Sequence, residues 1–482
     1  MPAKTIMIQG TCSDAGKSLI TAALCRIFKE DGIHVAPFKS QNMSLNSYVT
    51  LDGREIARAQ VVQAQAAGLE PDTRMSPILL KPGSETKSQV IINGKPVSNM
   101  SWQEYMMYKP KAFAAVKESF DSLANEYELI VIEGAGSPAE INLNHDDIVN
   151  MGMARYAKAP VLLVGDIDRG GVFASFIGTY ELLNDWERDL LTGFVINKFR
   201  GDPSLLQEAL DVTEQRTGKK MIGTVPWIYD LGLPEEDAVR QKSKKSGLDL
   251  LDIVIVGLNH ISNYTDFDAF ELEEDVQLRL VRSPQEFGNP DCVIIPGSKT
   301  TVSDFKYIQQ SGMAQKIKDF ALGGGQTVGI CGGFQILGNE VHDPQQIEST
   351  SCETLGLLNM STTMLEDKSL RRISADFKGF GKVDGYEIHH GKTENLDCEV
   401  IVQNEGEILG LKNKNIWGTY LHGIFDNDHF RHDFLNGLRN KKGLAVKTEI
   451  KKYDLEPSFQ KLADTVRSSI DISFLYNILE IR

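Results

Sequence analysis

Short apolar runs alternate with longer polar stretches along the first half of the chain, and this pattern predicts an α/β fold. The runs lie at residues 6–8, 34–39, 128–132, 160–166, 193–198 and 222–226. Continuous apolar runs are typical of strands that are buried on both faces of a parallel sheet. The segments between them have room for helices that cross back over the sheet. We therefore expect a doubly wound, mostly parallel sheet, with less regular strand-like pieces at 75–81 and 88–92.

The apolar pattern starts again after a charged stretch at residues 240–247. This stretch reads RQKSKKSG, and we expect a linker there, with a solvated loop as the alternative. New runs follow at residues 251–256, 276–281, 292–296 and 327–330. The sequence therefore predicts two α/β domains, residues 1–240 and 250–438. A C-terminal extension, residues 439–482, has helical periodicity and no identifiable chemistry.

Composition narrows the class of protein. The 482 residues are 41% hydrophobic and 24% charged, as in a soluble globular protein of two or three domains. A net charge of −15 argues against a nucleic-acid groove as the main function. No apolar run approaches the roughly 18–20 residues that cross a bilayer, and the N-terminus does not resemble a signal peptide. The six cysteines form no CxxC pair, which fits a reducing cytoplasm. No pattern indicates an oligomeric state.

A glycine-bounded loop follows the first apolar run. It reads GTCSDAGKS, from Gly10 to Ser18, and precedes an apolar helical segment. Such a loop directs backbone N–H groups and a helix N-terminus at phosphate oxygens, while its lysine adds a charge and its serine hydroxyl can reach Mg²⁺. Five residues, not four, separate Gly10 from Gly16. An ordinary strand–helix turn is the alternative. We expect the loop to bind a nucleotide through Gly10, Thr11, Asp14, Gly16, Lys17 and Ser18.

Three polar residues end later strands of the same predicted sheet. Ligands of open α/β sheets bind beyond the carboxyl ends of the strands. Lys39 is therefore placed to meet phosphate or substrate, and Asn197 to contact a base or ribose. Glu133 is the candidate second Mg²⁺ ligand beside Ser18, because phosphate oxygens alone leave the cation under-coordinated. The alternatives are a solvated lysine, a simple turn and a helix-capping acid.

The second domain carries a candidate nucleophile. Cys331 stands in GICGG, between a buried strand and a helix. This is the setting of a nucleophile elbow, where glycines permit a strained turn that presents the side chain above the sheet. A helix N-terminus also favours the reactive thiolate. The alternative is a buried structural cysteine.

A thiolate catalyst needs a base and a site for the developing oxyanion. His422, in WGTYLHG, is the best candidate for the base, with His389 and His390 as rivals. The loop PGSKTT, residues 296–301, follows another predicted strand. We expect its backbone N–H groups to stabilise the oxyanion.

These motifs together carry a resemblance to a known family. GICGG, PGSKTT and GTYLHG look like a class I glutamine amidotransferase domain. Their combination with GTCSDAGKS, EGAGSPAEINL, SQNMSLN, VGDIDRGGVFAS, VINKFRGD and VPW resembles the cobyric acid synthase family over about residues 1–438. The resemblance implies a P-loop NTPase-like domain related to dethiobiotin synthetase, followed by a flavodoxin-like amidotransferase domain.

The resemblance also implies a reaction. Glutamine hydrolysed at Cys331 would supply ammonia, and ATP with Mg²⁺ would activate four carboxylates (b, d, e and g) of adenosylcobyrinic acid a,c-diamide to give adenosylcobyric acid. Cobyrinic acid a,c-diamide synthase, or another glutamine-dependent amidase-ligase, is the alternative. A ParA/MinD-type switch with an inactive second domain is a third hypothesis, against which Cys331 and His422 argue.

The sequence departs from many class I amidotransferases at one position. These enzymes carry a Glu two residues after the histidine, which orients the base, and here that residue is Ile424. The cobyric acid synthase family is similar in lacking the Glu. The orienting group is therefore not identified by the motif, and we take Glu387 as a guess.

Overall fold

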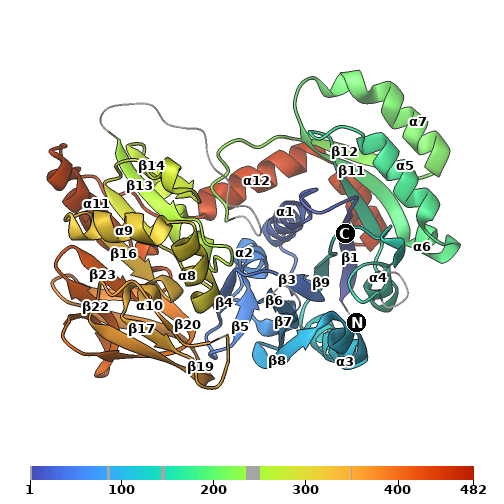
Figure 1. Cartoon of the computed structure of the whole chain (residues 1–482). Helices are drawn as coiled ribbons and strands as arrows, with labels where there is room; N and C mark the ends of the chain where they lie inside the picture. The colour runs from blue at the N-terminus through green and yellow to red at the C-terminus, as the bar shows by residue number, and fades with distance from the viewer. Residues whose placement is uncertain (1–2, 84–86, 143–146, 235–249, 349, 482) are drawn as a thin grey trace.

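The computed structural model describes residues 3–83, 87–142, 147–234, 250–348 and 350–481. Two lobes stand side by side in Figure 1, the first blue to green and the second yellow to orange. The expected linker at residues 240–247 lies outside the described residues. Among the helices that are described, none is both long and apolar enough to cross a membrane.

A parallel sheet forms the centre of the first lobe. Its strand order is β12-β11-β10-β1-β9-β2, and every neighbouring pair is parallel. The register places Gly10 beside Val164 and Ile8 beside Glu133, so the loops after β1, β9 and β10 meet at one edge. The strands are β1 (Lys4–Gly10), β2 (Val35–Phe38), β9 (Leu129–Glu133), β10 (Val161–Asp166), β11 (Leu191–Phe199) and β12 (Lys220–Pro226).

Helices cover both faces of this sheet, which confirms the expected doubly wound class. One face packs against α3 (Trp102–Glu126), α4 (Met151–Ala157) and α5 (Val172–Leu182). The other packs against α1 (Lys17–Glu30). Strands buried on both sides explain the continuous apolar runs in the sequence. The remaining elements of this part are α6 (Asp185–Leu190), η3 (Pro203–Leu206) and α7 (Gln207–Thr217).

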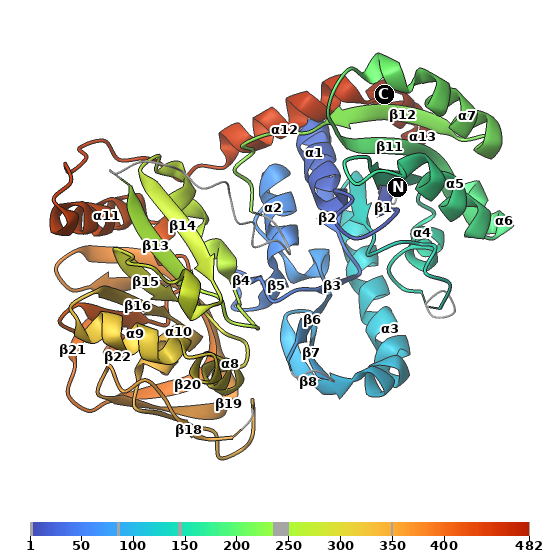
Figure 2. The ribbon, with the colours of Figure 1, turned by 45° about the horizontal axis from the view of Figure 1, so that its top comes forward.

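An insertion between β2 and α3 projects toward the second lobe. The expected strand-like pieces form β6 and β7, but in a separate small sheet of order β3-β6-β7-β8. A two-stranded ribbon, β4 with β5, leads into α2, and Figures 1 and 2 both place these elements between the lobes. The bounds are β3 (Gln41–Met43), β4 (Ser47–Val49), β5 (Glu55–Ala57), α2 (Arg58–Ala66), η1 (Thr73–Met75), β6 (Ile78–Pro82), β7 (Lys87–Ile92) and β8 (Lys95–Ser101).

The second lobe also contains a parallel sheet, of order β14-β13-β15-β16-β23. Its strands are β13 (Leu251–Val256), β14 (Val276–Val281), β15 (Cys292–Ile295), β16 (Gln326–Ile330) and β23 (Ile416–Thr419), with α8 (Thr301–Gln310), α9 (Met313–Leu322) and α10 (Gly332–Leu337) among the helices. Two 3₁₀ segments, η4 (Tyr264–Leu272) and η6 (Ile424–Asp426), pack near each other. A third, η5 (Pro284–Glu286), follows β14.

Antiparallel strands extend this second sheet. They include the long hairpin of β19 (Met360–Phe377) and β20 (Gly381–Asn395), which the apolar pattern did not predict. Strands β21 (Glu399–Asn404) and β22 (Glu407–Asn413) connect β19 to β23, and β17 (Glu340–His342) and β18 (Cys352–Glu353) lie beyond β19.

The C-terminal segment joins the two lobes. The expected boundary at residue 438 falls inside α11 (Asp428–Lys442) of the second lobe. The chain then returns to the first lobe as α12 (Glu456–Ser469) and α13 (Ile472–Leu479), and Figure 2 shows α12 alongside α1. Arg26 pairs with Glu456 at 2.8 Å, and Arg467 pairs with Asp31 at 2.9 Å. Residues from both ends of the chain therefore build the first lobe.

Candidate functional site

The glycine-bounded loop is held by the neighbouring strands. Thr11 donates its N–H to the Val164 carbonyl at 2.9 Å. Gly16 has a φ of 99°, and a Cβ there would lie 1.9 Å from Nδ2 of Asn197, so the close approach requires glycine. The Asn197 amide donates to the Ala15 carbonyl at 2.9 Å. Asn197 thus braces the loop, and its expected contact with the nucleotide stays a prediction.

Two cations lie at the mouth of this loop. The Lys17 ammonium donates to the carbonyl oxygens of Cys12 at 2.9 Å and Gly136 at 3.2 Å, which connects the loop to the segment after β9. Lys198 donates to the Asp14 carbonyl and pairs with Asp166 at 2.9 Å. These contacts fix positive charge beside the backbone that we expect to hold phosphates.

Glu133 lies at the centre of a buried polar cluster. Its carboxylate accepts from the Ser18 hydroxyl at 2.8 Å, from the Lys39 ammonium at 2.9 Å and from the Gln63 amide. Burial opposes ionisation, but Lys39 and these donors hold the pKa of Glu133 below its ordinary value. The structure therefore brings the two predicted Mg²⁺ ligands, Ser18 and Glu133, into contact. One ionised carboxylate and one hydroxyl fit Mg²⁺, which takes few protein ligands and completes its shell with water and phosphate oxygens.

Cys331 occupies a strained turn between β16 and α10. Its φ of 50° and ψ of −107° are unusual for a residue with a side chain. A Cβ at Gly333 would lie 2.0 Å from the Ile295 carbonyl oxygen, and one at Gly332 2.7 Å from the Ser298 nitrogen. The two glycines therefore let the turn sit against the preceding strand and the PGSKTT loop. This is the geometry expected of a nucleophile elbow.

His422 is paired with an aspartate that the sequence did not identify. Its Nδ1 lies 2.7 Å from a carboxylate oxygen of Asp266 on η4, and the other oxygen accepts the Gly423 N–H at 2.9 Å. Burial alone would lower the pKa of His422, but Asp266 and the neighbouring Cys331 raise it to about 10. Since Asp266 occupies Nδ1, Nε2 is the nitrogen left to exchange a proton with Cys331. The three side chains form a Cys–His–Asp arrangement.

The prediction that Glu387 orients His422 is wrong. That carboxylate pairs with His389 at 2.8 Å and with Arg371, not with His422. His389 also faces the Gly391 carbonyl through its other nitrogen and stacks on Tyr420, so both of its ring nitrogens are engaged. Burial and nearby lysines lower the pKa of His390 to about 4. Neither rival histidine shows the link to Cys331 and a carboxylate that His422 has.

The expected role of the PGSKTT loop needs a correction in detail. The N–H groups of Lys299, Thr300 and Thr301 already donate, to His260, Ser298 Oγ and Glu348 respectively. They are therefore not available to an oxyanion. The Ser298 nitrogen faces Gly332 instead, and within the described chain its N–H makes no hydrogen bond. Ser298, with the N–H of Gly332 at the start of α10, is the better-placed donor pair.

A cavity opens beside Cys331 at the boundary between the lobes. Most of its wall comes from the second lobe, while Lys81 reaches it from β6 of the first. Burial lowers the pKa of Lys299, against the opposing effect of Glu348. Burial raises the pKa of Glu348 to about 7, against the opposing effect of Lys299. The cavity thus offers three lysines, Lys81, Lys299 and Lys368, and one titratable acid, Glu348, near the thiol.

Comparisons with known proteins agree with this division into two lobes. Residues 6–238 match the CobQ/CobB/MinD/ParA nucleotide binding domain, and residues 252–430 match the CobB/CobQ-like glutamine amidotransferase domain. The chain is 49% identical to a cobyric acid synthase of Nitratidesulfovibrio vulgaris, over 99% of this chain and 98% of that protein. A cobyric acid synthase of Clostridium botulinum is also 49% identical, with 98% and 99% covered. A solved glutamine amidotransferase is 17% identical over 39% of this chain and 98% of its own, with a TM-score of 0.33.

Proposed function

The chain belongs to the cobyric acid synthase family, a family of glutamine-hydrolysing ligases, and from this membership we propose the reaction and the residues that carry it. The substrate is adenosylcobyrinic acid a,c-diamide, whose b, d, e and g carboxylates are amidated to give adenosylcobyric acid in the cytoplasm. The observation that supports this most directly is one chain with two centres: a thiol–imidazole–carboxylate group in one lobe and a phosphate loop with a buried carboxylate in the other.

The second lobe would release ammonia from glutamine. The Cys331 thiolate attacks the side-chain amide carbon, and the oxyanion that forms is stabilised by the N–H groups of Ser298 and Gly332. His422 gives a proton from Nε2 to the leaving nitrogen, and ammonia departs as the γ-glutamyl thioester remains. His422 then takes a proton from water, which attacks the thioester and yields glutamate and the free thiol. Asp266 holds the ring in the orientation that these transfers need.

The cavity beside Cys331 has the charges to bind the amino-acid end of glutamine. Lys299 is placed to pair with the α-carboxylate, and Glu348 with the α-ammonium group. Because burial raises the pKa of Glu348 to about 7, an incoming cation favours its ionised form. The site would thereby recognise glutamine as a zwitterion and place its amide at the thiol.

The first lobe would make the carboxylate reactive. Hydroxide is a poor leaving group, so ammonia cannot displace it unaided. The substrate carboxylate attacks the γ-phosphorus of ATP, which gives an acyl phosphate and ADP, and ammonia then displaces phosphate to form the amide. Lys17 and Lys39, which lie at the phosphate loop and beside Glu133, would stabilise the charge of the transferred group. Ser18 and Glu133 would hold Mg²⁺, which when bound neutralises part of the phosphate charge.

Two substitutions test this division of labour. We expect Cys331→Ala to abolish glutamine-dependent amidation and to leave activity with a high concentration of ammonium. Lys17→Ala should abolish amidation with either nitrogen source while glutamine hydrolysis persists. Cys352→Ala, a half-exposed cysteine of the same lobe, is the control and should change neither activity. Loss of both activities in Cys331→Ala would contradict separate ammonia production.

The substrate is tested separately. Cobyrinic acid and its a,c-diamide are each offered with ATP and glutamine, and the products are identified by mass spectrometry. We expect four successive amidations of the a,c-diamide. Turnover of only the undiamidated acid would favour the a,c-diamide synthase instead, and ATP hydrolysis without any glutaminase activity would favour a nucleotide-driven switch.

A further inference from the structure

Asn46 and Ser47, at the start of strand β4 of the nucleotide-binding lobe, make a reciprocal pair of hydrogen bonds with the second lobe. The Ser47 N–H donates to the side-chain oxygen of Asn263 at 2.9 Å. In return, the Tyr264 N–H donates to the side-chain oxygen of Asn46 at 3.0 Å. Ser47 and Asn263 are both buried. The Ser47–Asn263 bond therefore satisfies polar groups that have little access to water, and such bonds are costly to lose. The Asn46–Tyr264 bond is half-buried.

This contact lies at the start of the 3₁₀ segment that carries Asp266. Asn263 precedes η4 with a left-handed φ of 54°, and its carbonyl accepts the Asp266 N–H at 3.0 Å. Asp266 is three residues further on and contacts both His422 and Gly423. The position of the Asp266 carboxylate therefore follows from the position of Asn263 and Tyr264, which the other lobe holds.

A buried ion cluster fixes the same ribbon against the amidotransferase lobe. Glu55 pairs with Lys81 of its own lobe and with Lys368 of the other, each at 2.6 Å. Lys81 also donates to the Ser47 hydroxyl at 2.9 Å. Burial opposes ionisation of Glu55, but Lys368 and Lys81 hold its pKa well below the usual range. Both lysines line the cavity beside Cys331, so this contact belongs to the wall of the glutamine site.

A third contact reaches the ring of the base. Tyr48 of β4 packs edge-to-face on Tyr386 of β20, with ring centroids 4.7 Å apart. Tyr386 stacks on His422 at 5.3 Å, and the two residues exchange backbone hydrogen bonds. The ribbon of the first lobe therefore supports His422 from one side and the Asp266 segment from the other.

We propose that Asn46, a residue of the nucleotide-binding lobe, is a positioning residue of the glutaminase centre: it holds the segment that carries Asp266, and through Asp266 it orients His422. This inference rests on the proposed role of Cys331, His422 and Asp266 in glutamine hydrolysis. The amidotransferase centre is then complete only with the first lobe docked, which places ammonia production at the contact between the lobes.

The test is Asn46→Ala in the full-length chain. Loss of the acceptor leaves the Tyr264 N–H without its partner and frees the start of η4, and displacement of a catalytic group by about 1 Å costs up to about 100-fold in rate. We expect kcat for glutamine hydrolysis to fall about 10-fold or more, with KM for glutamine changed less than about 2-fold. Alkylation of Cys331 by iodoacetamide, followed by peptide mass spectrometry, should require a higher pH than in the wild type. Amidation with free ammonium should be unchanged.

Two further variants separate positioning from a general loss of structure. Asn46→Asp keeps the acceptor oxygen and should retain kcat within about 3-fold of the wild type. Glu70→Ala removes the exposed pair that Glu70 of the first lobe makes with Arg372 of the second. It keeps Arg372 over the Tyr48 ring and should leave both readouts unchanged.

Three results would overturn the proposal. They are an unchanged kcat and alkylation profile in Asn46→Ala, an equal loss in Glu70→Ala, or a loss in Asn46→Asp as large as in Asn46→Ala. If Asn46→Ala also loses ammonium-dependent activity, the comparison of Asn46→Asp with the wild type decides between positioning and a general loss of structure. Absence of any glutaminase activity in the wild type would instead contradict the proposed function itself.

Discussion

At the scale of single residues, Asp266 is the group whose removal separates orientation of the base from supply of the nucleophile. Its carboxylate accepts from both His422 and Gly423. In Asp266→Asn, the amide nitrogen favours the wrong tautomer of the ring, and we expect kcat for glutamine hydrolysis to fall on the order of 10³- to 10⁴-fold. Ammonium-dependent amidation should persist. Asp268→Asn, in the same 3₁₀ segment, is the control, and an equal effect there would contradict a specific role for Asp266.

The protonation of His422 gives a prediction on stability. Its pKa is about 10 in the folded chain, compared with an ordinary value of 6.5. A raised pKa means that the folded state binds the proton more tightly, so the stabilisation is complete below pH 6.5 and is lost as the pH rises through about 10. His422→Gln should therefore lower the free energy of unfolding most near pH 6. Its difference from the wild type should shrink as the pH rises toward 10. The control is His429→Gln, at an exposed position, which should show no such trend. A stability difference for His422→Gln that does not change with pH would contradict the prediction.

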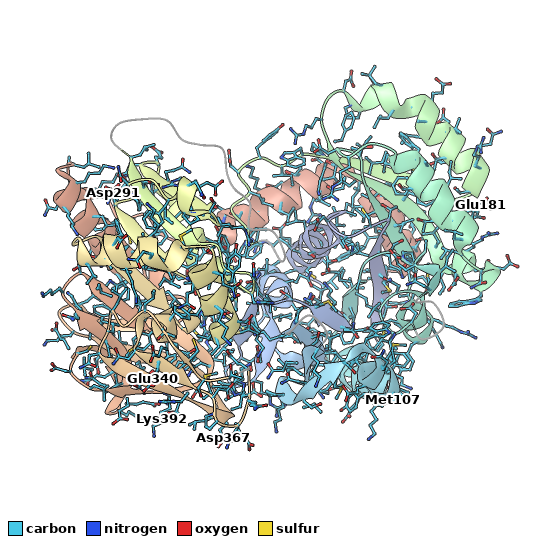
Figure 3. All side chains as sticks on the ribbon, viewed as in Figure 1. Met107, Glu181, Asp291, Glu340, Asp367 and Lys392 are labelled. Carbon is cyan, nitrogen blue, oxygen red and sulfur yellow. The ribbon has the colours of Figure 1, made fainter. Side chains whose placement is uncertain are left out.

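Recognition of glutamine is testable at Lys299. If Lys299 pairs with the α-carboxylate, Lys299→Met removes a charge-assisted hydrogen bond, and KM for glutamine should rise about 10- to 100-fold. Hydrolysis of 4-aminobutanamide, which lacks that carboxylate, should be the same in variant and wild type. Lys392, which Figure 3 shows at the outer edge of the second lobe, provides the control Lys392→Met. An equal loss with both substrates would contradict the pairing.

The residues of the site differ in how far the sequence could predict them. Cys331 and the phosphate loop were found because each occupies a strand–turn–helix context that local glycines mark. Asp266 was missed because it lies 156 positions from His422, in a short 3₁₀ segment with no periodicity. Its only local signal is a position after a buried strand, which it shares with many other acids. The availability of backbone N–H groups in PGSKTT depends on partners such as His260 and Glu348, which a motif does not contain.

At the scale of elements, the ribbon of β4 and β5 contributes to stability through Glu55. Breaking a buried ion pair by neutralising one partner leaves the other charges uncompensated and costs about 3–5 kcal/mol. We expect Glu55→Gln to lower the free energy of unfolding by about that amount at pH 7. The folded pKa of Glu55 is depressed from 4.5, so its contribution is present above that pH. The difference between wild type and variant should therefore shrink as the pH falls below 4.5.

The matched control is Glu70→Gln, which removes the exposed partner of Arg372 at the same boundary. Exposed pairs contribute about 0–1 kcal/mol, so this change should be small at every pH. A Glu55→Gln variant that is no less stable than Glu70→Gln would show that the buried cluster does not hold the lobes together. Urea unfolding curves across the pH range measure both variants.

The strands of the two parallel sheets were predictable, and several other elements were not. Buried strands such as β9 and β10 produce continuous apolar runs because helices cover both of their faces. The hairpin of β19 and β20 has exposed positions at many points along its length, so its pattern resembles a polar loop. The pieces at 75–81 and 88–92 were correctly expected to be extended, but only tertiary pairing decides which sheet a strand joins.

At the scale of the whole molecule, the two ends of the chain meet in one lobe. Helix α12 packs on α1, and α13 follows it against β1. Phe459, Leu462 and Val466 of α12 belong to the same apolar cluster as Ile6 and Ile8 of the first strand. The two groups lie more than 450 residues apart in the sequence. Helical periodicity predicted the helices, but no sequence pattern indicates which lobe they cover. Figure 3 shows Met107 and Glu181 on the outer side of the first lobe and Asp291 on the outer side of the second, away from this junction.

The C-terminal helices cover part of the apolar core of the first lobe. Phe459 packs in the same apolar cluster as α1 and is 2% exposed. Truncation of a buried Phe costs about 3–5 kcal/mol because the cavity collapses only partly. Phe459→Ala should therefore lower the free energy of unfolding by that amount and weaken ATP binding at denaturant concentrations that the wild type tolerates. Val446→Ala, half exposed in the segment between α11 and α12, should change stability by less than about 0.5 kcal/mol. If the two variants unfold alike, α12 does not contribute to the stability of the first lobe. If Phe459→Ala alone loses ATP binding, residues near the C-terminus are part of the nucleotide-binding fold. Truncation of the chain after α11 must then remove synthetase activity before it removes the glutaminase centre.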